Sequence, residues 1–364
     1  MMWIIILLLV IVFSIRGIVF LVKGFHKFSF ITKLAEKNKP LSWAAAILPV
    51  ALIVVLTTVL LNVWAMTIVL IHLFLFWAAA AGIGRLIRGK REMKRNFEGL
   101  AAILFTTVYL CIGWYFAHHV YRTSYTFSTP KELGQERIRV VGIADLHLGI
   151  TLDCDGFSEQ CGRISDEEPD VVLVAGDFVD DDSSKSGMVE ACRVLGKVKA
   201  KYGVYFTMGN HDAGYYDSRG FSIDDLRSEL KKNGVTVLED ESVLVNDSFY
   251  IVGRKDASAP ERKAMKELVS GLDKSKYIIA ADHQPNDYAG EAGCADLVFS
   301  GHTHGGHIFP AGYIGVLIGA NDRAYGTETR DGTNFVVTSG ISGWALPFKT
   351  GARSEYVVMD IEHK

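Results

Sequence analysis

Five short polar clusters in the second half of the chain contain residue types that bind divalent metal ions. Almost every cluster follows a short apolar run, so these side chains recur where buried strands would end. Carboxylate and neutral imidazole ligands suit Mn, Fe, Zn and similar ions. The pattern is the one that a two-metal hydrolase requires. The clusters read Asp145-Leu146-His147, Gly176-Asp177-Phe178-Val179-Asp180, Gly209-Asn210-His211-Asp212, Asp282-His283-Gln284-Pro285 and Gly301-His302-Thr303-His304-Gly305-Gly306-His307.

The spacing within the clusters suits shared metal ions. Asp145 and His147 are two residues apart, as are His302 and His304, so the members of each pair can turn toward one ion. The carboxylate of Asp177 could bridge two ions. Two further ligand types, an amide oxygen and an imidazole, are supplied by Asn210 and His283.

Two ions about 3.5–4 Å apart would activate a water molecule and clamp a phosphoryl group during in-line displacement. The leaving oxygen then needs a proton, which a histidine can supply near neutral pH. Taken singly, the DxH and GDxxD clusters also suit surface polarity or a turn, and His283 alone suits a hydrogen-bonded structural histidine. The ordered set of five favours the metal site.

The composition separates the two parts of the sequence. The 364 residues are enough for two domains, and the apolar residues, 49% of the chain, are concentrated in the first third. The net charge of −3 gives no strong field, so no nucleic-acid partner is expected. The five cysteines form no CxxC pair. Cys154 and Cys161 could form a disulfide or remain two free thiols.

Four apolar runs in the first third are each about as long as a helix that crosses a bilayer. We therefore expect an all-α transmembrane region at residues 1–121, with the lipid bilayer as a partner. A cleaved signal peptide is the alternative for the first run, although a basic start and an obvious small-x-small cleavage site are lacking. The runs span residues 2–22, 43–61, 63–83 and 100–121.

Basic residues are concentrated in two segments, 23–39 and 85–95, whereas the turn near Asn62 has no Lys or Arg. The positive-inside rule places both basic segments in the cytoplasm. The chain is then a multi-pass protein of the cell membrane with an extracytoplasmic catalytic domain. On this reasoning, the loss of one span would invert the orientation.

Residues 122–136 look like a polar connector, and residues 137–364 form the expected catalytic domain. Short β-rich runs alternate there with helical stretches at 188–200, 222–233 and 260–272. This alternation predicts an α/β domain with its site in the loops at strand ends. The expected strands span 138–144, 171–175, 204–208, 235–238, 249–253, 277–281, 297–300, 334–338 and 355–361.

The motifs DLH, GDFVD, GNHD, the isolated His283 and GHTHGG resemble, in order, the five motifs of the calcineurin-like metallophosphoesterase superfamily. The resemblance covers about residues 137–362 and implies a four-layer αββα sandwich with a dinuclear site at the sheet ends. GHTHGG after an apolar run is especially similar to the YkuE-like bacterial branch, many of whose members are membrane-attached. His307 stands where that branch often has Gln. This difference affects the expected substrate contacts and leaves the expected metal binding unchanged.

The resemblance also implies residue roles around two divalent cations of the Mn, Fe or Zn type. A hydroxide bridging the cations would attack phosphorus, and His211 would protonate the leaving group as general acid. Asp180 would orient His211, and Asp212 would support the same loop. The first cation would be held by Asp145, His147, Asp177 and His304. The second would be held by Asp177, Asn210, His283 and His302.

These features predict a membrane-anchored, metal-dependent phosphoesterase acting on a phosphomonoester or phosphodiester. A lipid-linked substrate is one option, because the anchor raises its local concentration. A second hypothesis makes the four spans a transporter or sensor that the soluble domain regulates. A third, for the opposite topology, is a lipid diphosphate hydrolase facing the cytoplasm.

Overall fold

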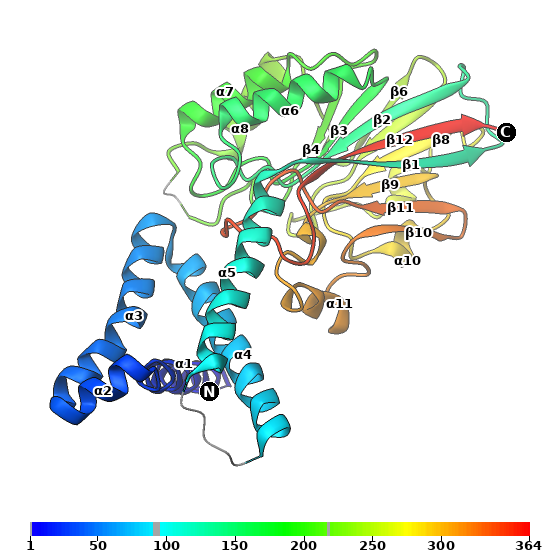
Figure 1. The fold of residues 1–364 in the computed structure, drawn as a ribbon. Helices are drawn as coiled ribbons and strands as arrows, with labels where there is room; N and C mark the ends of the chain where they lie inside the picture. Colours follow the sequence, from blue (N-terminus) through cyan, green and yellow to red (C-terminus); the bar gives the residue numbers. More distant parts are fainter. Residues whose placement is uncertain (1, 90–94, 217–218) are drawn as a thin grey trace. The chain divides into compact units, whose positions relative to one another are not determined.

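Long apolar helices fill the first third of the chain and two β-sheets fill most of the rest (Figure 1). The computed structural model describes residues 2–89, 95–216 and 219–364, and of residues 2–12 and 88 the backbone alone. The chain divides into two units, residues 1–112 and residues 113–364. Three basic residues of the segment 85–95, Lys90, Arg91 and Lys94, lie outside the described residues.

Two asparagines divide the apolar sequence into separate helices. The side chain of Asn38 accepts the Leu41 N–H at 3.0 Å, and that of Asn62 accepts the Ala65 N–H at 2.8 Å. Each satisfies a backbone donor that a helix start leaves unpaired. The helices described in this part are α1 (Met2–His26), α2 (Ser29–Lys37), α3 (Lys39–Leu60), α4 (Val63–Arg88) and α5 (Phe97–His118).

Among the described residues, three helical stretches are long and apolar enough to cross a membrane: Lys39–Leu60, Val63–Ile87 and Phe97–His118. The expected number of four spans is therefore corrected to three. The expected first span lies in α1, whose described side chains begin at residue 13 and include Arg16. That described stretch is shorter than the roughly 20 residues that a bilayer requires.

The segment expected as a connector is part of the sheet. Strand β1 (Tyr121–Thr129) runs parallel to β12 (Glu355–His363) over nine residue pairs. The expected fourth span, 100–121, therefore ends earlier, at His118. Only residues 119 and 120 separate α5 from β1.

The second unit contains two six-stranded mixed sheets. The first has the order β1-β12-β2-β3-β4-β5, and the second has the order β10-β11-β9-β8-β7-β6. In both, the central strands are parallel, so their carboxyl ends share one edge. The remaining strands are β2 (Arg137–Ile143), β3 (Val171–Ala175), β4 (Val204–Thr207), β5 (Thr236–Val237), β6 (Glu241–Val245), β7 (Phe249–Gly253), β8 (Tyr277–Ala281), β9 (Leu297–Ser300), β10 (Gly326–Arg330) and β11 (Thr333–Val337).

Alternate residues along each strand face opposite sides of its sheet and so contribute to two different core layers. Ile138 and Val140 of β2 belong to the core between the sheets, whereas Val141 and Ile143 face the core beneath the outer helices. Gly142 faces Phe299 of the other sheet, whose ring occupies the space that a Cβ would need. The α/β sandwich predicted from the sequence is thus confirmed. The helices are α6 (Cys154–Asp166), α7 (Lys185–Leu195) and α8 (Ile223–Lys232) outside the first sheet, and the short α9 (Met265–Leu268) and α10 (Tyr288–Glu291) outside the second.

Among the described residues, the strands β1, β6 and β10 and the helices α2, α6 and α10 were not expected, and neither was α11 (Ile314–Leu317). The helix expected at 260–272 shrinks to the four residues of α9. The N–H of Lys263 donates to Asp240, and its carbonyl accepts from Arg254. Because these partners hold the backbone in a loop, the first turns of the expected helix do not form.

Candidate metal centre

The five clusters meet at one edge of the sandwich because they follow strands that run the same way. Asp145 lies two residues after β2, Asp177 two after β3 and Asn210 three after β4, all in the first sheet. His283 and His302 each lie two residues after β8 and β9 of the second sheet. Loops beyond the carboxyl ends of parallel strands are the usual binding place in such sheets.

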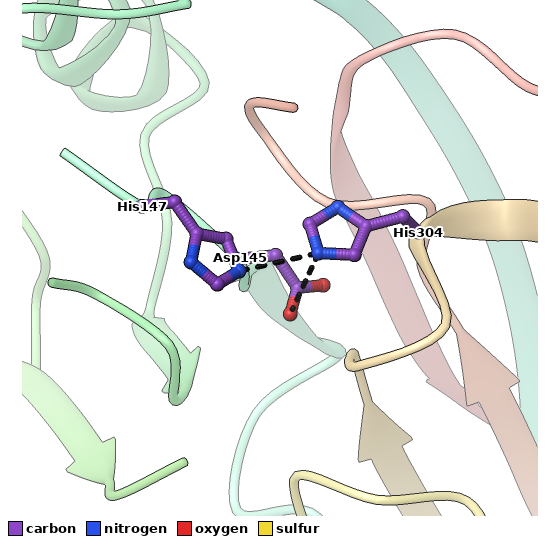
Figure 2. Close-up of side chains that lie close together, drawn as sticks. All are labelled: Asp145, His147 and His304. Carbon is purple, nitrogen blue, oxygen red and sulfur yellow. Dashed lines mark hydrogen bonds and ion pairs between the residues drawn. The ribbon is translucent and has the colours of Figure 1, made fainter. Parts of the chain in front are cut away.

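One group of ligand atoms consists of Asp145, His147 and His304, all buried, with one potential ligand atom from each within 4.8 Å of the others. Figure 2 shows the two imidazoles pointing toward each other across the Asp145 carboxylate. The Nε2 atoms of His147 and His304 are 3.2 Å apart, and His304 Nε2 lies 4.0 Å from Asp145 Oδ1. His147 Nε2 also lies 3.6 Å from Asp177 Oδ2.

A second group consists of Asp177, His283 and His302, joined by the amide oxygen of Asn210. His283 Nε2 lies 3.1 Å from both Asp177 Oδ2 and Asn210 Oδ1. His302 Nδ1 lies 3.0 Å from the same Asn210 oxygen. Asp177 Oδ2 therefore stands between the two groups.

The donor set fits cations. His147 Nδ1 lies 2.9 Å from an Asp180 carboxylate oxygen, and His283 Nδ1 lies 2.6 Å from the Ala175 carbonyl oxygen. Both oxygens can only accept, so each Nδ1 donates, and each ring in its neutral form turns an Nε2 lone pair inward. Lone pairs of nitrogen and oxygen that converge without a proton between them repel one another. A cation removes that repulsion, so the two groups are typical of a dinuclear metal site.

The pKa values of these groups reflect the same crowding. Burial lowers the pKa of His302 to about 4 and lowers the pKa of His304 well below its usual 6.5. Burial also opposes charge on His283, but the Asp177 carboxylate outweighs it and raises the pKa of His283 well above 6.5. The position of His283 thus attracts positive charge, whether from a proton or from a metal ion.

Asp180 contacts two histidines rather than the one expected. Oδ2 accepts from His147 Nδ1 at 2.9 Å, and Oδ1 accepts from His211 Nδ1 at 3.1 Å. Burial opposes its ionisation, but these two hydrogen bonds hold the pKa of Asp180 far below its usual range. One carboxylate therefore fixes the orientation of both rings, as partners of ligating histidines do at metal sites.

Asp212 lies beneath the site and is fully buried. Its carboxylate accepts backbone N–H groups from Asp177, Phe178, Val179 and Gly209 at 2.8–3.1 Å. It ties the loop after β3 to the loop after β4. Burial raises the pKa of Asp212 to about 6.

The backbone of the site is strained. Asp145, His147, Asp177, His302 and His304 all have positive φ, between 37° and 69°. Each costs roughly 1–3 kcal/mol, and such residues cluster at functional sites. Glycine permits the close approach of neighbouring loops, because a Cβ on Gly209 would strike the Asp177 side chain.

Several contacts around the site were not expected. Asn210 donates its amide N–H to the hydroxyl of Tyr215 at 2.8 Å, and Gln284 donates to Asp256 at 3.0 Å. The rings of Tyr215 and Trp344 lie 5.0 and 5.4 Å from that of His211. The position of Trp344 in a Gly-rich loop after a strand is a sequence signal for a residue at the mouth of a site. The other three contacts had no sequence signal beyond their polar residue types.

His307 and Asp282 do not reach the inward-facing lone pairs. His307 stacks on His304 at 5.3 Å, and its buried Nε2 has no hydrogen-bond partner among the described residues. Asp282 pairs instead with Arg254 and Arg262. All five cysteines, including Cys154 and Cys161, are free thiols.

Buried carboxylates and imidazoles at the ends of two stacked sheets define a metallohydrolase. The family model of the calcineurin-like phosphoesterases matches residues 138–306. A metallophosphoesterase of Aquifex aeolicus (strain VF5), named as uncharacterized, is 30% identical over 248 residues, which cover 66% of this chain and 91% of the relative. The chain belongs to the calcineurin-like metallophosphoesterase family and is a metal-dependent phosphoesterase.

Two further relatives are a transmembrane protein and YkuE itself. A zebrafish (Danio rerio) transmembrane protein with a metallophosphoesterase domain is 27% identical over 234 residues, 60% of this chain and 52% of the relative. The Bacillus subtilis (strain 168) protein YkuE is 23% identical over 247 residues, 63% of this chain and 80% of the relative. The superfamily predicted from the motifs is confirmed, whereas YkuE is only a distant homologue.

Replacing Asp180 by Asn tests its double contact. An Asn side chain offers one acceptor oxygen in place of two, so at least one histidine loses its orienting partner. We expect Mn²⁺ affinity, measured by calorimetry on the full chain, to fall roughly 10–100-fold while the fold is retained. Asp182→Asn, an exposed neighbour, is the control and should bind as the wild type does. Unchanged affinity in Asp180→Asn would contradict the positioning role.

Proposed function

We propose that the chain is a membrane-anchored phosphoesterase that hydrolyses phosphomonoesters or phosphodiesters with two divalent cations. The observation that carries the proposal is the shared carboxylate: Asp177 Oδ2 lies 3.6 Å from a nitrogen of one group and 3.1 Å from a nitrogen of the other. Asp145, His147, Asp177 and His304 would hold one cation, and Asp177, Asn210, His283 and His302 the other. Two cations bound there would polarise the phosphoryl oxygens and lower the pKa of water.

His211 is the proposed proton donor to the leaving oxygen. Its Nδ1 faces Asp180, so Nε2 is the atom that would carry the proton. Burial lowers the pKa of His211, but the hydrogen bond to Asp180 and the charges of Asp177 and Asp180 outweigh it and raise that pKa above 6.5. The raised pKa lets the ring keep its proton to higher pH, which suits this role. Asp180 positions the ring, and Asp212 supports its loop from below.

The metal requirement is tested with purified full-length protein and bis(p-nitrophenyl) phosphate. We expect Mn²⁺ to support hydrolysis and EDTA to abolish it. Asp177→Asn removes the shared carboxylate and should lower activity on the order of 100-fold. Asp247→Asn, a loop carboxylate between β6 and β7, serves as control. Full activity in Asp177→Asn would sink the two-cation assignment.

The role of His211 predicts a dependence on the leaving group. A p-nitrophenolate ion leaves without a proton, whereas an alkoxide needs one. We expect His211→Ala to lower hydrolysis of an alkyl phosphate ester roughly 100-fold or more, and that of a p-nitrophenyl ester far less. Equal losses for both esters would argue against proton donation and would leave His211 as a phosphate-binding residue.

An extracytoplasmic catalytic unit remains part of the proposal, and three spans support it as well as four. The stretches Lys39–Leu60 and Val63–Ile87 are joined by a short turn, so the basic segments before and after this pair lie on one side. The positive-inside rule makes that side the cytoplasm. The third span, Phe97–His118, then leads outward. Removing the expected first span changes only the side of the membrane on which the amino terminus lies. The catalytic unit stays on the same side, contrary to the inversion expected above.

Reporter fusions test this orientation in a bacterial host. Alkaline phosphatase after Lys364 should be active, and a green fluorescent protein at the same point should be dark. Fusions after Gly89, between the second and third spans, are the matched control and should give the reverse signals. A fluorescent fusion at Lys364 with an inactive phosphatase would place the catalytic unit in the cytoplasm.

A further inference from the structure

A strongly apolar segment leaves the metal centre and lies on the protein surface. Residues 308–321 contain no charged side chain. They form η2 (Ala311–Tyr313) and α11 (Ile314–Leu317), which lies away from the two sheets in Figure 1. Phe309, Ile314, Leu317 and Ile318 are 56%, 53%, 82% and 73% exposed. Soluble proteins rarely expose so many neighbouring apolar side chains, and those that do use them for binding.

The segment is fixed directly to the last metal cluster. It begins after His307, and the ring of Tyr313 packs on Gly306, where it occupies the space of a Cβ. The carbonyl of His307 accepts the N–H groups of Thr350 and Gly351 at 2.8 and 2.9 Å. The N–H of Phe309 donates to the Thr350 hydroxyl at 3.1 Å. Loop 349–354 therefore holds the start of the segment in place.

The same loop is bound to the carboxyl end of α5. The N–H of Lys349 donates to the Gly113 carbonyl at 2.8 Å, and the N–H of Ser354 donates to the Phe116 carbonyl at 2.9 Å. The Ser354 hydroxyl donates to the Ala117 carbonyl at 2.9 Å. All of these residues belong to the unit 113–364. One hydrogen-bonded loop thus connects the end of α5 with the apolar segment.

The end of α5 has the character of a bilayer interface. Phe97–His118 is a candidate membrane span, and Trp114 and Tyr115 in its last turns are each 49% exposed. Trp and Tyr are enriched where spans leave the hydrocarbon. Only two residues separate α5 from β1, and loop 349–354 is bound to Gly113, Phe116 and Ala117 at this end of α5. Loop 349–354 and the segment attached to it are held near the same level.

A cavity beside loop 349–354 is suited to contact a lipid headgroup. Its volume is about 350 Å³, and its lining includes Phe116, Tyr325 and Arg353. The exposed guanidinium of Arg353 lies 4.3 Å from the centre of the Tyr121 ring. A cation held over an aromatic ring at this place suits the phosphate of a lipid headgroup.

We propose that residues 309–318 insert into the interfacial layer of the bilayer that anchors α5, and that the mouth of the metal centre faces lipid headgroups. The substrate is then a phosphate ester carried by a membrane lipid. The insertion stands on the contacts above, whereas the substrate class rests on the proposed function. Interfacial segments of this kind bury their apolar side chains about 5–10 Å into the headgroup and acyl boundary.

Insertion is tested without reference to activity. A photoreactive benzoylphenylalanine replaces Leu317 in the full chain, reconstituted in nanodiscs of phosphatidylethanolamine and phosphatidylglycerol. Illumination should give a phospholipid adduct detectable by mass spectrometry. Leu244, 40% exposed in β6, is the matched control position and should give none. Absence of a lipid adduct at position 317, or a cross-link there to a second copy of the chain, would overturn insertion.

The substrate class is tested with two esters that share one leaving group. One is methylumbelliferyl phosphate in solution, and the other is a phosphodiester that joins methylumbelliferone to dioleoylglycerol in the nanodisc. We expect the double variant Leu317→Glu, Ile318→Glu to lose about tenfold of kcat/KM on the anchored ester and to stay within about twofold on the soluble one. Leu244→Glu should leave both values unchanged.

Equal losses on the two esters, or no loss on the anchored one, would overturn the lipid substrate. A wild-type protein that releases methylumbelliferone from neither ester in Mn²⁺ would sink the proposed function instead. The photochemical adduct would still decide insertion in that case, so the two failures are distinguishable.

Discussion

Mutual repulsion among inward-facing lone pairs is the constraint on which the centre depends. His147 and His283 are each turned by a hydrogen bond at Nδ1, so Nε2 faces carboxylate, amide or imidazole acceptors. A cation bound among these acceptors would satisfy them together. The positive φ values at Asp145, Asp177 and His302 represent strain that the fold sustains to keep the acceptors together. In the proposed mechanism, phosphate ester hydrolysis depends on that enforced proximity.

The two sheets supply the rigidity that this strain requires. Parallel strands deliver one cluster each to a common edge, and the buried Asp212 carboxylate ties two of the loops through four backbone N–H groups. Asp180 then orients one proposed ligand and the proposed acid together. The geometry of the site is therefore coupled to the core. A substitution in the core beneath the site would shift the positions of the site residues.

Local sequence patterns predicted the strands in which every residue is buried. Strands such as Val171–Ala175 and Tyr277–Ala281 are continuously apolar and were predicted with their observed bounds. Strand β1 alternates exposed and half-buried residues, so its sequence resembles that of a polar connector. Its partner β12 lies more than 200 residues away, and no local pattern indicates that the two strands pair. Helix α6 was missed although Phe157, Cys161 and Ile164 are spaced for one buried helical face. Its polar surface and low overall hydrophobicity obscured that pattern.

The sequence by itself determined the family, the candidate ligands and the presence of long apolar helices, because ligand chemistry and hydrophobic length are properties of residue type and order. Only the tertiary structure decided which lone pairs face one another, that Asp180 contacts His147 as well as His211, and that loop 349–354 joins the end of α5 to an exposed apolar segment. These facts depend on distances between residues far apart in the chain. Such distances are set by sheet order and strand register, which no local pattern encodes.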